Sequence, residues 1–198
     1  KAQWQALSRA VLPRLFGIGS LVGLHWLCFY GAIKLSNASV AVATMATTSF
    51  FAAIVGPILL RQKVKWYEIG LGLLILPGMA LVVGNINWDM RIGFGVGIIS
   101  ALLAAIFSTL NKKVLEHNPP PSMVMSFVEL FAATCVCSLI LPVLIWQSPE
   151  TQVMPSTQDW IWLLVLAWVC TLLPYYLTLQ AMRHISVFAT NLTINLEP

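Results

Sequence analysis

The chain has 198 residues, of which 59% are hydrophobic and 9% are charged, and its formal net charge is +4. Soluble globular domains carry about 25% charged residues, so this composition excludes an ordinary soluble domain. A net charge this small does not indicate a nucleic-acid-binding protein. The sequence is therefore interpreted as that of a protein embedded in lipid.

Seven apolar segments follow one another along the chain. They are residues 12–33, 39–60, 66–83, 92–110, 122–145 and 160–182, and a seventh that begins near Val187 and is unfinished where the chain stops. A helix needs about 20 apolar residues to cross the bilayer. Strands of a membrane barrel are shorter and alternate in polarity, so helices are expected. The pattern predicts an all-α membrane protein, a polytopic helical bundle forming one domain, with both chain ends cut from a longer protein.

The basic residues lie mainly on one side of this predicted topology. With the amino-terminal flank in the cytoplasm, only Lys34 and Arg91 of the eleven Lys and Arg residues fall outside. The cytoplasmic ones are Lys1, Arg9, Arg14, Arg61, Lys63, Lys65, Lys112, Lys113 and Arg183. Cytoplasmic loops of membrane proteins carry an excess of Lys and Arg, so this bias predicts the orientation.

Two stretches look alike when one is shifted by 149 residues, namely 28–49 and 177–198. Each holds the end of an aromatic-containing helix, then Ala, an apolar residue, a basic residue, a short polar turn and a helix rich in Ala and Thr. Few residues are identical, so the prediction of a repeat rests on the pattern. The shift implies a repeating unit of five helices, and an odd number of helices inverts the second copy in the membrane.

The stretch AMRHISVFATNLTINLEP (residues 181–198) is an Ala-apolar-Arg turn followed by a helix that reaches Asn-Leu-Glu-Pro. The stretch RQKVKWYEIGLGLLILPGMALVV (residues 61–83) is a basic turn that leads into a Gly-rich helix. In both, the chain resembles the EamA family of the drug/metabolite transporter superfamily.

The resemblance implies ten helices in two inverted repeats, of which this chain would hold the third to the ninth. Residues 1–91 would be the end of the first repeat, and residues 92–198 most of the second. The resemblance also implies a secondary transporter that exports small metabolites such as amino acids across the plasma membrane, here the bacterial inner membrane. The expected partners are a small solute and the lipid bilayer, and no cofactor is expected.

Two carboxylates lie inside apolar segments, Glu129 in residues 122–145 and Glu197 in the last segment. A charged side chain at the bilayer centre costs on the order of 3 kcal/mol, so it usually faces a cavity or a partner. Both are candidates for a substrate-ammonium or proton site. The alternative is a carboxyl that packs between helices, and Pro198 after Glu197 favours a structural kink there.

Polar and aromatic side chains at similar depth complete the candidate site. The predicted solute-binding residues are His25, Trp26, Thr48, Glu129, Tyr175, Asn195 and Glu197. Trp26 and Tyr175 are equivalent under the shift of 149 residues. Ser, Thr and Asn also hold membrane helices together, and aromatic residues near the ends of spans form interfacial belts. Packing therefore remains the alternative for this set.

Other function classes have less support. An intramembrane enzyme would have His25, Glu129 and Glu197 available, but the sequence has no HExxH, GxSxG or paired-Asp motif. The four cysteines lie in apolar segments without CxxC or Cys/His spacing, so no metal site is predicted. A passive channel or scaffold is the remaining alternative.

The predicted orientation can be tested at two positions. In a full-length protein without its own cysteines, Lys63→Cys should not react with a membrane-impermeant thiol reagent in intact cells, because residue 63 is expected in the cytoplasm. Gln152→Cys should react, and both should react after the cells are permeabilised. Labelling of position 63 in intact cells would reverse the orientation.

Overall fold

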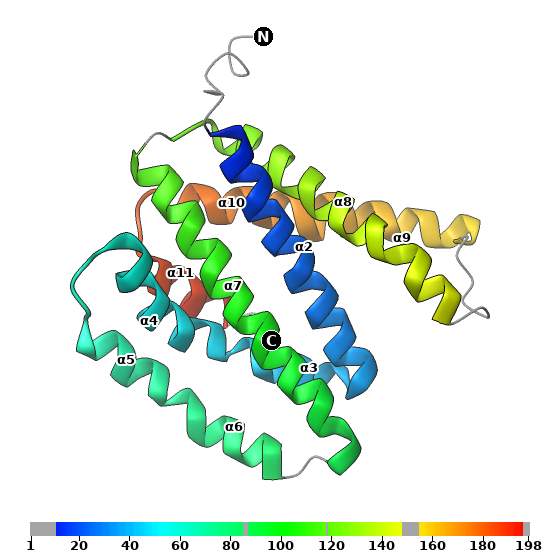
Figure 1. Cartoon of the computed structure of the whole chain (residues 1–198), viewed down its shortest axis with the longest axis horizontal. Helices are drawn as coiled ribbons and strands as arrows, with labels where there is room; N and C mark the ends of the chain where they lie inside the picture. The colour runs from blue at the N-terminus through cyan, green and yellow to red at the C-terminus, as the bar shows by residue number, and fades with distance from the viewer. Residues whose placement is uncertain (1–10, 85–86, 118, 148–154, 196–198) are drawn as a thin grey trace. The chain divides into compact units, whose positions relative to one another are not determined.

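The computed structural model describes residues 11–84, 87–117, 119–147 and 155–195, which are helical and contain no strand (Figure 1). The helices are α2 (Leu12–Leu35), α3 (Ala38–Met45), α4 (Thr47–Leu60), α5 (Trp66–Leu73), α6 (Ile75–Gly84), α7 (Arg91–His117), α8 (Ser122–Gln147), α9 (Thr157–Ala167), α10 (Leu173–Ala181) and α11 (Val187–Ile194). A 3₁₀ turn, η1 (Trp88–Met90), precedes α7, and a π-helix, η2 (Trp168–Leu172), joins α9 to α10.

Five stretches of these described residues are long and apolar enough to cross a membrane. They are Leu12–Leu35, Ala38–Leu60, Trp88–His117, Ser122–Val143 and Thr157–Ala181, and Trp66–Val82 is a shorter apolar helix. Large apolar side chains such as Leu81 and Leu139 are more than 70% exposed, as expected where lipid is the solvent. Each of the seven predicted segments contains helix, and the chain is an all-α polytopic membrane protein.

Helix α7 is longer than the sequence analysis predicts. It runs to His117, so most of the connection expected over residues 111–121 is helical. Lys112 and Glu116 are one turn apart, with Nζ and Oε1 separated by 3.9 Å, and such pairs stabilise helices. The helix ends just before three consecutive prolines at 119–121, because a proline disfavours helical backbone in the residue before it.

Three predicted spans are interrupted, two of them near prolines. Pro77 lies four residues after Leu73, the last residue of α5. Pro174 lies four residues after Cys170, which belongs to η2. A proline donates no hydrogen bond to the carbonyl four residues back, and its ring crowds that carbonyl. Pro57 and Pro142, in contrast, lie inside the continuous helices α4 and α8.

The third interruption, at Ala46 between α3 and α4, involves no proline. The hydroxyls of Thr44, Thr47 and Ser49 each donate to the carbonyl three residues back, at 2.6, 2.7 and 3.2 Å. Such side-chain bonds compete with the backbone ladder and bend helices. This explains why the span predicted over residues 39–60 is formed by two helices.

Helices α3 and α11 have matching bounds. Both have 8 residues, and their first residues, like their last residues, are 149 positions apart in the sequence. Their N-caps, Asn37 and Ser186, are also 149 residues apart, and each side chain accepts a hydrogen bond from the backbone N–H three residues on. The same local structure therefore recurs at positions that the shift makes equivalent.

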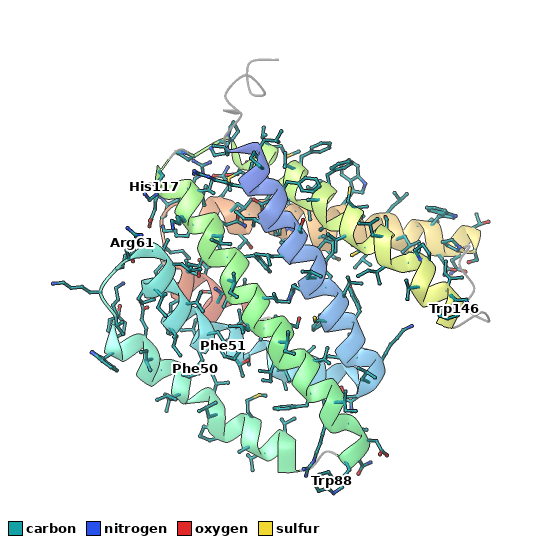
Figure 2. All side chains as sticks on the ribbon, in the orientation of Figure 1. Phe50, Phe51, Arg61, Trp88, His117 and Trp146 are labelled. Atoms are coloured by element: carbon teal, nitrogen blue, oxygen red, sulfur yellow. The ribbon has the colours of Figure 1, made fainter. Side chains whose placement is uncertain are left out.

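The chain divides into two compact units. Unit 1 comprises residues 1–23 and 120–181, and unit 2 comprises residues 24–119 and 182–198. In unit 2, α7 packs against α3, α4 and α11, and α4 also packs against α5. Figure 2 shows Arg61 and His117 at one end of unit 2 and Trp88 at the other.

Glycines allow close helix contacts in both units. A Cβ atom on Gly93 of α7 would lie 2.7 Å from the Cβ of Ser36 and 2.8 Å from the carbonyl carbon of Leu35. In unit 1, a Cβ atom on Gly23 of α2 would lie 2.9 Å from the carbonyl oxygen of Ala133 in α8. Small residues that permit this approach are typical of helix interfaces in membranes.

Gly93→Ala should destabilise the full-length protein by about 1–3 kcal/mol, because the new methyl group would overlap backbone that cannot move aside easily. The thermal unfolding midpoint in detergent measures this. Gly95→Ala is the matched control, since this glycine of the same helix is exposed and has no atom within 4 Å of the added methyl. Equal midpoints for the two variants would show that the contact at Gly93 does not limit stability.

Candidate functional site

Glu129 and Tyr175 form a polar pair in unit 1. Glu129 lies on α8 and is 0% exposed. Tyr175 lies on α10, directly after Pro174, and its hydroxyl donates a hydrogen bond to Oε2 of Glu129. Burying a carboxyl is costly unless it is hydrogen-bonded, and the phenol meets part of that need. Both residues belong to the predicted site, and the structure brings them into contact.

The backbone of α2 lies against the backbone of α8 at Glu129. Gly19 of α2 lies so close to α8 that an added Cβ atom would overlap the backbone of Glu129 and the side chain of Ala132. The absence of a side chain at position 19 lets α2 cover the level at which the carboxyl is buried. Glu129 thus lies in a tightly packed part of unit 1.

Asn195 lies in unit 2, at the break between α3 and α4. It is the C-cap of α11, and its Nδ2 donates to the carbonyl oxygen of Ala46 and to Oγ of Ser49, each at 3.1 Å. The carbonyl oxygen of Ala46 also accepts from Oγ of Ser49, so two side chains donate to it. Ala46 is the residue 149 positions before Asn195.

Thr48 lies on α4 beside this contact. It is 4% exposed, and within the described part of the chain its Oγ1 has no hydrogen-bond partner. The residue 149 positions later is Glu197, which lies outside the described residues together with Pro198. Thr48 therefore adds a buried hydroxyl next to the groups that Asn195 contacts.

His25 is directed toward α7. Its Nδ1 lies 2.9 Å from both the carbonyl oxygen and the Oγ of Ser100, and Ser100 Oγ donates to the carbonyl oxygen of His25 at 3.0 Å. The imidazole also packs edge-on against Phe107, with ring centroids 5.5 Å apart. Across the described residues, no hydrogen bond joins His25 to Thr48 or Asn195. Trp26 beside it is half-buried.

The predicted residues are therefore distributed over both units. Glu129 and Tyr175 lie in unit 1, whereas His25, Trp26, Thr48 and Asn195 lie in unit 2. Of the predicted residues that the structure describes in unit 2, Asn195 and Thr48 lie at the helix break, and His25 and Trp26 lie on α2. What these groups offer chemically is hydrogen bonding in an apolar surrounding and, in unit 1, one buried carboxyl.

The structure also adds polar groups that the sequence analysis did not include among the predicted solute-binding residues. Ser49 and Ser100 bind the predicted residues directly. Ser108 accepts from Nδ2 of Asn191 at 3.2 Å, and Lys112 donates to the carbonyl oxygens of the α10–α11 turn. Serine and threonine are common in membrane helices, so composition alone does not distinguish these residues from packing residues.

Comparison with known proteins supplies the family. The sequence model of the EamA-like transporter family matches residues 2–84 and 91–198. No curated protein and no solved structure gives a significant match. The two matched stretches together cover nearly the whole chain, including all the α-helices described above. The chain belongs to the EamA-like transporter family, a family of the drug/metabolite transporter superfamily.

Proposed function

We propose that the protein exports small metabolites such as amino acids across the bacterial inner membrane by alternating access. The observation that carries the proposal is the family match over two stretches of a chain whose helices are apolar enough to span a membrane. Transport across a membrane follows from the family. Export and the class of solute rest on the resemblance of residues 61–83 and 181–198 to members that export metabolites.

We also propose that residues 1–91 and 92–198 belong to two inverted repeats. Support comes from the equal bounds of α3 and α11 and from the contact between Asn195 and Ala46, which the shift of 149 residues makes equivalent. Two positions related by a two-fold axis meet only close to that axis. The axis of the repeat would then pass beside this contact, and transporters commonly bind solute near the interface of inverted repeats.

Each unit contributes a different kind of polar group to this proposal. In unit 2, Thr48 and Asn195 provide a buried hydroxyl and an amide where a helix is interrupted, with His25 and Trp26 on α2. In unit 1, Glu129 with Tyr175 provides a carboxyl for an ammonium group or a proton. Glu197 is included because of its place in the repeat.

Glu129→Gln should slow transport about tenfold or more, because an interaction with a charged group is worth about 1.5–3 kcal/mol and the amide has no charge. The measurement is efflux of labelled amino acids from proteoliposomes that contain the full-length protein, compared with empty liposomes. Thr134→Ala, an exposed position of the same helix, is the control and should transport normally. Unchanged efflux by Glu129→Gln at several pH values would assign Glu129 to packing.

Asn195→Ala and Trp26→Ala should weaken solute affinity several-fold, since a lost hydrogen bond in a membrane protein is worth about 1 kcal/mol. Ser138→Ala and Thr109→Ala should change affinity less. Thr109 is buried but donates only to a carbonyl of its own helix, and Ser138 is exposed. Competition for efflux by unlabelled solute gives the affinities, and equal values for all four variants would contradict the assignment of Asn195 and Trp26.

A further inference from the structure

A cavity of about 250 Å³ lies at the end of unit 2 that Arg61 and His117 mark in Figure 2. It lies between the end of α4, the start of α5, the last turns of α7 and the start of α11. One part of its wall is apolar, with Pro57, Leu60 and Phe188, and the other part is charged. The cavity is separate from the groups around the break at Ala46.

The charged part of the wall has an excess of positive charge. Nζ of Lys65 donates to Oε1 of Glu68 at 3.3 Å, and this hydrogen bond raises the pKa of Lys65. Lys112 is near Glu116, so the two carboxylates of the wall offset two of its lysines.

Two further basic side chains of the wall have no carboxylate partner in the described part of the chain. Lys63 and His184 both line the cavity, and within the described part of the chain neither has a hydrogen bond or an ion pair. The cavity therefore carries at least one uncompensated positive charge, at the position of Lys63.

The N-terminus of α11 also favours an anion in this cavity. Val187 and Phe188 both line the cavity, and the first amides of a helix have no acceptor within it. The Ser186 hydroxyl accepts from the N–H of Ala189, which leaves the two earlier amides for a ligand. Backbone amides and the helix dipole favour a negatively charged group at this point.

The position and the mixed wall indicate the kind of anion. The cavity lies where the spans α4 and α7 end, at the level at which lipid headgroups meet the protein. Basic cavities between membrane helices at this level bind the headgroups of anionic lipids, and an apolar wall suits the beginning of the acyl chains. We propose that this cavity binds a phosphate group, supplied by the headgroup of an anionic phospholipid.

The full-length protein in detergent is titrated with short-chain phosphatidylglycerol, with phosphatidylcholine of the same chain length, and with inorganic phosphate, while its thermal unfolding midpoint is followed. Phosphatidylglycerol should raise the midpoint in a saturable manner and phosphatidylcholine should not. Lys63→Gln should weaken the apparent affinity for phosphatidylglycerol about fivefold, the effect of one lysine charge near a membrane surface.

Lys113→Gln is the matched control. Lys113 is an exposed lysine in the last turns of α7, and it does not line the cavity. It should bind phosphatidylglycerol like the wild type, and Lys63→Arg should retain most of the affinity. A saturable effect of inorganic phosphate alone that Lys63→Gln weakens would support the phosphate site and replace the lipid by free phosphate as its source. No saturable shift with either anion, or equal losses in Lys63→Gln and Lys113→Gln, would overturn the proposal.

Discussion

The close approach of α7 to the chain around residues 35–44 is the contact on which unit 2 depends. At Gly93 the backbone of Leu35 occupies the space where a side chain would be, and at Gly97 the side chain of Thr44 does. This contact fixes α3 against α7, next to the break at Ala46. Asn195 of α11 then donates to the carbonyl oxygen of Ala46.

In lipid, the polar groups that a fold buries need partners from the protein itself. This requirement explains the contacts of both units: Asn195 serves the break at Ala46, Tyr175 serves Glu129, and Lys112 serves the carbonyls of the α10–α11 turn. The groups that hold the helices together are thus the same groups that have the chemistry to bind a solute. The proposed binding residues therefore also have structural contacts, as Asn195 and Tyr175 do.

The basic residues that predict the orientation also have local roles. Nζ of Lys112 lies 2.7 Å from the carbonyl oxygen of Met182 and 3.2 Å from that of Ile185, so it caps the end of one helix from another. Lys65 pairs with Glu68 at the start of α5. A positive charge at a membrane surface thus fulfils both a topological and a structural requirement, because helix ends leave carbonyls that need donors.

Apolar length, caps and turns are local properties, so the helical segments and the transporter family could be predicted from the sequence, and the repeat with its shift of 149 residues stays a prediction. The positions of prolines alone do not locate the interruptions, since Pro77 and Pro174 lie near interruptions and Pro57 lies inside a continuous helix. Only the tertiary structure decided that His25 binds Ser100 and that Glu129 binds Tyr175, partners 75 and 46 residues apart. These contacts depend on how each helix is rotated and how deeply it is placed against its neighbour. Hydrophobic periodicity cannot specify them in segments that are apolar on every face.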